Sequence, residues 1–296
     1  MKIVSLIVTY NRCEKLLTTL EATLALPFST VVVVDNCSSD GTSEILAQQN
    51  DPRLEVLTAT QNCGGAAGFA LGAEYIAQHV KSDWVLFFDD DAYPDSSFIE
   101  RFQEICRPEY SLYCAKVLDT KGQLCKMNVP WRTSQGTFAS SLKYLKRPQD
   151  FIPQVDQVTE VVTFSFVGCV ISHDLLVRTW QLIDKDIFIY FDDVFYSWKL
   201  HVAGKKILYH PNLVIHHDIK TSPTDRVPAW KVYYLVRNML LSRYILAGKP
   251  FFSMTAISLR LIKYLLSSLR GPERKKRIYF FFKGVMDGVL NRRKSL

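Results

Sequence analysis

The stretch TVVVVDNCSSDGT, residues 30–42, combines a predicted strand with the start of the helix that follows it. Thr30 to Val34 is apolar and β-branched, which favours a buried strand. Asp35 and Asn36 close that strand, and the turn-forming run from Ser38 to Gly41 precedes a helix predicted from Thr42 to Gln49. A strand that leads directly into a helix is the repeating unit of an α/β sheet.

The same unit recurs on both sides of this stretch. Strands are predicted at Ile3–Thr9, Leu54–Thr58 and Trp84–Phe88, and helices at Glu14–Leu26 and, after a glycine-rich loop at Asn62–Gly68, as far as about Ala77. Strands that alternate with helices in this way predict an α/β fold class with a mostly parallel central sheet.

The second half of the chain is less regular. Val117 to Arg147 fits no single pattern, whereas Val161 to Ile171 is predicted as a strand pair around Gly168. The remaining predicted elements are a strand at Ile187–Phe191, a helix from about Val194 to Ala203, and short strands at Lys206–Tyr209 and Leu213–His216. From Pro228 onward the pattern is helical, amphipathic and basic.

Polar residues gather where the predicted strands end. They are Tyr10-Asn11, Asp35-Asn36, Asn62 and Asp89-Asp90-Asp91. Ligands of parallel α/β sheets bind beyond the carboxyl ends of the strands. The sequence therefore predicts a binding site at this edge of the sheet.

The triplet Asp89-Asp90-Asp91 follows an apolar strand. Carboxylates crowded at a strand end repel one another, and a divalent cation relieves that repulsion. Their hard oxygen atoms suit Mg²⁺ or Mn²⁺, and such a metal stabilises a diphosphate as it leaves. The structural alternative is a polar turn after a buried strand.

Two further pairs are candidates for chemistry. One carboxylate of Asp192-Asp193 is a candidate general base, with a helix N-cap as the structural alternative. A neutral imidazole of His216-His217 would complete a metal shell, and the alternative is a structural or surface pair. The glycine-rich loop lacks both GxGxxG and GK[ST], which argues against a dinucleotide-dependent dehydrogenase and a P-loop NTPase.

Taken together, these motifs resemble family 2 glycosyltransferases of the GT-A fold, in the branch of galactofuranosyl- and rhamnosyltransferases. The resemblance spans about Val4 to His217. It is carried, in order, by SLIVTYNR (5–12), VVVVDNCSSDGT (31–42), NCGGAAGFALG (62–72), FFDDDA (87–92), and FVGCVISHDLL (166–176) with IYFDDVFYSWKLHVAGKKILYHPNLVIHHD (189–218). A weaker similarity, to a YYxxRN element, covers Tyr233-Tyr234 and Arg237-Asn238.

The resemblance implies roles for individual residues. Asp193 would be the base, with Asp192 as the alternative, and Asp89, Asp91 and His217 would be the metal ligands, His217 preferred over His216 by its spacing from Asp193. Asp35 would contact the base of the nucleotide. The implied donor-binding residues are Thr9, Tyr10, Arg12, Asp35, Asn62, Gly64, Gly65 and Asp90.

The sequence also departs from the family pattern. Asp192 stands where many relatives have Glu, and Lys199 where Arg is common. The QxxRW element of processive polysaccharide synthases is absent, which argues against a cellulose- or hyaluronan-synthase role.

Charge is unevenly distributed along the 296 residues. Residues 220–296 contain 17 Lys and Arg against 3 Asp and Glu, so this part carries +14; with +7 overall, residues 1–219 carry −7. A basic, aromatic-rich helical region suits an anionic membrane surface, and the alternative is an ordinary helical cap. We therefore expect a GT-A catalytic domain at 1–219 and a membrane-associating helical region at 220–296.

Location follows from three observations. Charged residues interrupt every apolar run of the C-terminal region, which argues against a transmembrane helix. The apolar run at Ile3–Val8 is too short for a signal peptide. The seven Cys form no CxxC pair, which favours a reducing compartment. The expected location is cytoplasmic and peripheral, on the inner face of the cell membrane.

The leading functional hypothesis is an inverting glycosyltransferase that needs Mn²⁺ or Mg²⁺. It would transfer a sugar, galactofuranose from UDP-galactofuranose or alternatively rhamnose from dTDP-rhamnose, to a hydroxyl of a glycan or lipid-linked glycan. A nucleotidyltransferase is an alternative from another class, although the N-terminal YNRCEKL is a poor phosphate-binding motif. The acidic body argues against nucleic acid as a partner.

Overall fold

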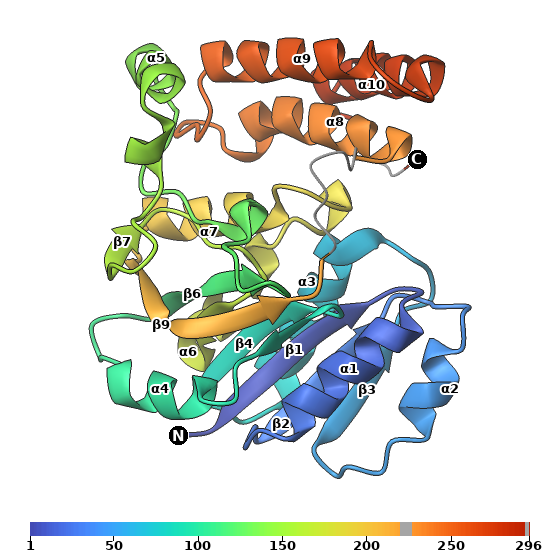
Figure 1. Cartoon of the computed structure of the whole chain (residues 1–296), viewed down its shortest axis with the longest axis vertical. Coiled ribbons are helices and arrows are strands. Elements are labelled where there is room, and N and C mark those ends of the chain that lie inside the picture. The colour runs from blue at the N-terminus through green and yellow to red at the C-terminus, as the bar shows by residue number, and fades with distance from the viewer. Residues whose placement is uncertain (220–226, 294–295) are drawn as a thin grey trace.

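A nine-stranded sheet organises the computed structural model, which describes residues 1–219, 227–293 and 296. The strand order is β3-β2-β1-β4-β8-β6-β9-β5, and β7 pairs with β9 (Figure 1). The strands are β1 Ile3–Thr9, β2 Thr30–Asp35, β3 Leu54–Thr58, β4 Trp84–Asp89, β5 Ala92–Pro94, β6 Leu112–Asp119, β7 Thr159–Val161, β8 Cys169–Ser172 and β9 Ile207–His217.

Strands β1 to β4 form the predicted parallel half of the sheet. Thr9 of β1 lies beside Asp35 of β2, and Val8 lies beside Asp89 of β4. The polar residues that follow these strands therefore emerge at one edge of the sheet.

The other half of the sheet is mixed. Strand β8 is antiparallel to both β4 and β6, whereas β6 and β9 are parallel. The short strand β5 pairs with the end of β9, with Ala92 opposite His217. This register places the turn of acidic residues directly beside the histidine pair.

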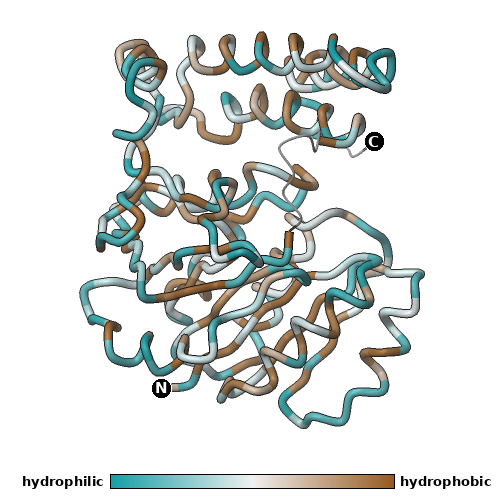
Figure 2. Tube along the Cα trace, viewed as in Figure 1, coloured by the Kyte–Doolittle hydropathy of each residue, from teal (hydrophilic) through white to brown (hydrophobic). Residues whose placement is uncertain are grey.

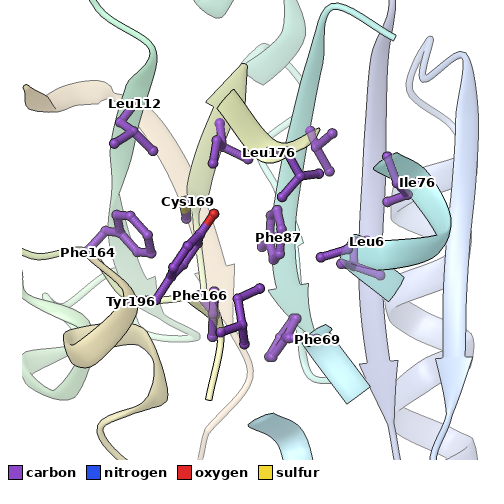
Figure 3. Close-up of a cluster of buried hydrophobic side chains, with 14 of the residues drawn as sticks. Leu6, Phe69, Ile76, Phe87, Leu112, Phe164, Phe166, Cys169, Leu176 and Tyr196 are labelled. Atoms are coloured by element: carbon purple, nitrogen blue, oxygen red, sulfur yellow. The ribbon is translucent and has the colours of Figure 1, made fainter. Parts of the chain in front are cut away.

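Helices cover both faces of the sheet. They are α1 Cys13–Leu24, α2 Thr42–Ala47, α3 Gly64–His79, α4 Phe98–Ile105, α5 Phe138–Lys146, α6 His173–Thr179, α7 Asp192–Val202, α8 Ala229–Ile245, α9 Met254–Ser268 and α10 Arg274–Val289. Alternate residues of β1 enter two cores: Leu6 packs with α3 and α6, and Ile7 packs with α1 and α4. The first core includes Phe87, Phe166 and Tyr196 (Figure 3). In Figure 2 much of the trace of the central strands has the colour of hydrophobic residues.

The C-terminal helices pack onto the preceding part of the chain through a third core. It joins Val236 and Met239 of α8 to Ala66, Ile187 and Phe195. Within the described residues, no helix combines the length and apolarity needed to cross a membrane. The expected boundary at residue 220 lies at the edge of 220–226, outside the described residues.

Three predictions of secondary structure are wrong. The glycine-rich segment is not a loop throughout, because α3 begins at Gly64 and the Asn62 Oδ1 accepts the Gly64 N–H at 2.8 Å. Residues 161–171 are not a strand pair, because β7 pairs with β9 while β8 inserts between β4 and β6. The two short strands at 206–216 form one strand, β9, whose pairing with β6 shifts register near Ala115.

The predicted strand at Ile187–Phe191 is also wrong. This segment is a single 3₁₀ turn, Lys185–Ile187, followed by a loop in which Phe188, Tyr190 and Phe191 have positive φ angles. Helix α7 then begins at Asp192. A left-handed backbone cannot join a sheet ladder, so alternating apolar residues here do not make a strand.

Candidate active site

A cavity of about 520 Å³ opens at the carboxyl ends of the strands. Most of its charged lining residues are ones that the sequence singled out. The charged residues that line it are Arg12, Asp89, Asp91, Asp192, Asp193, His217 and Lys231. Among the predicted donor-binding residues, Arg12 and Gly65 line the cavity, whereas Thr9, Tyr10, Asp35, Asn62, Gly64 and Asp90 do not.

Asp89, Asp91 and His217 form a compact cluster. Their ligand atoms all lie within 4.8 Å of one another. The His217 Nε2 lies 3.1 Å from Asp91 Oδ1, while its Nδ1 lies 3.1 Å from Asn128 Oδ1. With Nδ1 hydrogen-bonded to an oxygen, Nε2 is the nitrogen presented to a metal. Two carboxylates and one imidazole suit Mn²⁺ or Mg²⁺, so these residues fit a metal ion.

The pKa values of Asp89 and His217 are raised in this cluster, whereas that of Asp91 is lowered. Burial and then the neighbouring Asp91 raise the pKa of Asp89 to about 7. Burial alone would lower the pKa of His217, but its contact with Asp91 and the surrounding carboxylates raise it to about 10. Burial likewise opposes ionisation of Asp91, yet hydrogen bonds from His217 and Arg12 lower its pKa. The site thus favours positive charge beside the carboxylates, as metal sites do.

Asp90 faces away from the cluster and fixes the end of β1. It accepts hydrogen bonds from Thr9 Oγ1 at 2.9 Å and the Tyr10 backbone N–H at 3.3 Å. Arg12 bridges Asp90 and Asp91, with 3.2 Å between its Nη1 and Asp90 Oδ1. Arg12 thus places one positive charge at the rim of the acidic site, while direct donor contacts by Thr9, Tyr10 and Asp90 remain predictions.

Asp35 is fully buried and shapes the turn after β2. Its carboxylate accepts the Ser38 N–H at 3.0 Å and the Ser43 hydroxyl at 2.7 Å. These bonds hold the turn that precedes α2. A contact between Asp35 and the base of a nucleotide remains a prediction.

The two acidic residues Asp192 and Asp193 begin α7 and are half-buried at the cavity. Burial and then repulsion by Asp193 raise the pKa of Asp192 well above its ordinary value. Burial also raises the pKa of Asp193 to about 6, against hydrogen bonds from Val194, Ser165 and Phe166. The Val194 N–H donates to the Asp193 carboxylate at 2.7 Å, but the helix N-cap given as the structural alternative is wrong, because Phe191 holds the N-cap position and Asp193 lies within the first turn of α7. These hydrogen bonds favour the ionised form of Asp193, which a general base requires.

The structure adds residues that the sequence did not reveal. Lys231 of α8 lines the cavity opposite the acids, and burial lowers its pKa. Asn128 orients His217, and Trp131 forms part of the wall. Lys231 lies among many other basic residues, and Asn128 and Trp131 lie in a stretch without a recognisable pattern. No local signal distinguished them.

Comparison with known proteins identifies the family of this chain. The Glycosyl transferase family 2 profile matches residues 5–174. Galactofuranosyltransferase GlfT1 of Mycolicibacterium smegmatis is 29% identical over 130 residues, which are 43% of this chain and 41% of that protein. The chain therefore matches less than half of the length of that relative.

Solved structures share the whole architecture at low sequence identity. A crystal structure of S. aureus TarS, residues 1–349, has a TM-score of 0.57 and 16% identity, covering 99% of this chain and 83% of that chain. The mannosyltransferase PcManGT of Pyrobaculum calidifontis, in complex with GDP-Man and Mn²⁺, has a TM-score of 0.59 and 15% identity, covering 98% and 88%. Because the family profile spans more than half of the chain, from β1 into α6, and the fold is that of GT-A enzymes, the chain belongs to glycosyl transferase family 2.

Proposed function

We propose that this chain is an inverting, metal-dependent glycosyltransferase that moves galactofuranose from UDP-galactofuranose to a hydroxyl of a lipid-linked or cell-surface glycan. Membership in a glycosyltransferase family argues against the nucleotidyltransferase alternative. The single observation that carries the proposal is that Asp89, Asp91 and His217 share one cavity with Asp192 and Asp193. The similarity to a galactofuranosyltransferase supports the choice of sugar.

Residues around the cavity have different proposed roles in the reaction. Asp193 would take the proton of the acceptor hydroxyl as that oxygen attacks the anomeric carbon. Attack from the face opposite the diphosphate inverts the configuration of that carbon. Asp89, Asp91 and His217 would hold Mn²⁺ or Mg²⁺, which supplies positive charge beside the leaving diphosphate when bound. Arg12 and Lys231 line the same cavity and add positive charge for the phosphates.

A donor screen tests the sugar. We expect UDP-galactofuranose to be consumed faster than dTDP-rhamnose by the full chain with Mn²⁺ and lipid-linked glycan acceptors, with products followed by mass spectrometry. Proton NMR of the product should show inversion at the anomeric carbon. Faster use of dTDP-rhamnose would replace the proposed sugar, and retention of configuration would reject the inverting mechanism.

We also propose that the chain binds the inner, anionic surface of the cell membrane from the cytoplasmic side. Apolar side chains are exposed at helical spacing along two C-terminal helices: Ile262 and Leu266 of α9 with Leu269 at its C-cap, and Tyr279, Phe282, Met286 and Val289 of α10. Exposed basic residues lie among them, including Lys263, Arg270 and Arg274 to Lys276. Helix α5, which contacts α9, exposes Phe138, Leu142 and Leu145 in the same spacing. Apolar stripes flanked by basic residues suit an anionic lipid surface.

Vesicle binding tests this attachment. The chain should sediment with phosphatidylglycerol-containing vesicles at low salt, and salt should weaken the binding because the attraction is partly ionic. Leu266→Ser with Phe282→Ser should reduce sedimentation. Leu17→Ser with Val56→Ser is the control, because these two residues are similarly exposed but lie outside these helices. Equal loss in both double variants, or no binding at low salt, would contradict membrane attachment.

A further inference from the structure

The segment just before the carboxylate pair has a backbone that few sequences adopt. Phe188 has φ 70° and ψ −68°, and the Ile189 N–H bonds to Ile187 O at 2.9 Å, which together form a γ-turn of the rare, positive-φ kind. Tyr190 and Phe191 follow with φ angles of 66° and 69°. Residues with side chains avoid these conformations unless their surroundings impose them. Some part of the molecule must therefore hold this loop.

The amide of Asn238, on α8, holds the loop by its carbonyl oxygens. The Asn238 Nδ2 donates to the carbonyls of Ile187 at 3.0 Å, Ile189 at 2.7 Å and Tyr190 at 3.1 Å. Asn238 is fully buried. The two N–H bonds of one amide are thus shared among three loop carbonyls, and that of Ile187 also accepts a hydrogen bond from within the loop, from the Ile189 N–H.

Arg237 orients that amide and adds a contact of its own. Its Nε donates to Asn238 Oδ1 at 3.0 Å, which turns the Nδ2 group toward the loop. Its Nη2 donates to the Ile187 carbonyl at 2.8 Å. The buried guanidinium lies over the rings of Tyr233 and Tyr234, with centroids at 5.1 and 4.9 Å. Its position is therefore fixed by packing as well as by hydrogen bonds.

The loop also contacts the start of α3, where the donor loop is expected. The Phe188 carbonyl accepts the Ala66 N–H at 3.1 Å, and the Phe188 ring stacks on Tyr234 at 4.7 Å. A Cβ added to Gly64 would lie 2.2 Å from the Phe188 carbonyl oxygen, so only glycine permits this approach. The carbonyls of residues 187–190 are thus all held by donors from α3 and α8.

We propose that Arg237 and Asn238 are positioning residues that hold the strained loop 187–191 so that Asp193 is directed into the cavity. This inference rests on the proposed role of Asp193 as the base. It gives α8 a part in the reaction that is separate from membrane attachment. Neither residue lines the cavity, so each acts through the loop.

Hydrogen exchange tests the contact independently of activity. Asn238→Asp keeps the shape of the side chain and an acceptor for Arg237, but it turns a carboxylate oxygen toward three carbonyls. We expect peptides that cover residues 187–195 to exchange roughly tenfold faster in this variant, because the loop loses its donors. Ser242→Ala is the matched control: Ser242 is also buried on α8, but within the part of the chain that the structure describes its hydroxyl bonds only to Met239 of the same helix. Exchange unchanged by Asn238→Asp would reject the contact.

Kinetics tests the positioning. Asn238→Asp should lower kcat about 10–100-fold with donor KM nearly unchanged, because misplacement of a reacting group by about 1 Å has effects of this size. In an Asp193→Asn background the same substitution should have little further effect, since both act on one group. Ser242→Ala should keep kcat. Wild-type kcat in Asn238→Asp, or full additivity with Asp193→Asn, would overturn the positioning role.

A second variant and a folding measurement distinguish positioning of the base from a purely structural role of α8. Arg237→Lys replaces Asn238→Asp in the kinetic test if Asn238→Asp does not fold. It keeps the charge but changes the donor geometry that reaches Asn238 and Ile187, so it should also lower kcat with donor KM nearly unchanged. Loss of folding in both variants, seen by thermal unfolding, would mean a purely structural role and would reject the proposal. An active Asp193→Asn enzyme would instead reject the base assignment. The hydrogen-exchange experiment would still test the loop contact, because it does not depend on activity.

Discussion

Replacing Asp193 with asparagine is expected to lower kcat about 10²–10⁴-fold, the usual effect of removing a general base. Asparagine keeps the size and an acceptor oxygen for the Val194 N–H, so α7 should stay in place. Donor binding should be unchanged, because the acidic cluster is untouched. Single-turnover kinetics with calorimetry of donor binding would measure the two quantities separately.

The pH dependence of kcat tests the same prediction in a second way. A base must be ionised to accept a proton, and burial raises the pKa of Asp193 to about 6. The kcat of the wild-type chain should therefore fall as the pH drops through about 6, well above the range of an exposed aspartate. The residual activity of Asp193→Asn should lack this acidic limb.

Asp192→Asn is the neighbouring control. Burial and repulsion by Asp193 raise the pKa of Asp192 well above its ordinary value, which disfavours Asp192 as the ionised base, so its substitution should cost less. An inactive Asp192→Asn beside an active Asp193→Asn would exchange the two assignments. Activity in both would reject the base mechanism.

The first four strands were predictable because their signals are local. Apolar β-branched runs end in turn residues and lead into helices, and β1 and β3 match the predicted bounds. Their parallel pairing then brings the polar ends together without further information. The acidic triplet and His217 lie at the ends of strands, β4 and β9, whereas the later acid pair was singled out by its motif, because the strand predicted before it is absent.

The loop before α7 was not predictable from its own residues. Ile187 to Phe191 has the apolar character of a strand, and its left-handed backbone is imposed by donors on α8, far away in the sequence. Strand β6 and helix α5 were missed as well. Strand β6 lies between β8 and β9, which come much later in the chain, and α5 packs against α9. Long-range contacts decide these elements, and a single sequence does not display them.

Removal of the metal is expected to abolish transfer, and His217→Asn is expected to lower kcat about 10²–10³-fold, the usual effect of losing one group that stabilises developing charge. His217 is buried between Asp91 and Asn128, so its substitution removes one of three ligand atoms from a fixed cluster. Chelation with EDTA should stop the reaction, and added Mn²⁺ should restore it in the wild-type chain. Calorimetry with Mn²⁺ alone should show weaker binding in His217→Asn and in Asp91→Asn.

The adjacent residue supplies a matched control for this prediction. His216 pairs with Asp95 at 3.1 Å, the same distance as the pair formed by His217 and Asp91, but it is more exposed and does not line the cavity. His216→Asn should therefore bind Mn²⁺ normally and keep kcat within about twofold, because a partly exposed pair of this kind contributes little. The comparison isolates ligation from the general loss of a carboxylate–imidazole contact on β9. Equal effects of the two histidine substitutions, or full activity in EDTA after exhaustive metal removal, would show that this cluster is structural and that the leaving diphosphate is stabilised by Arg12 and Lys231 instead.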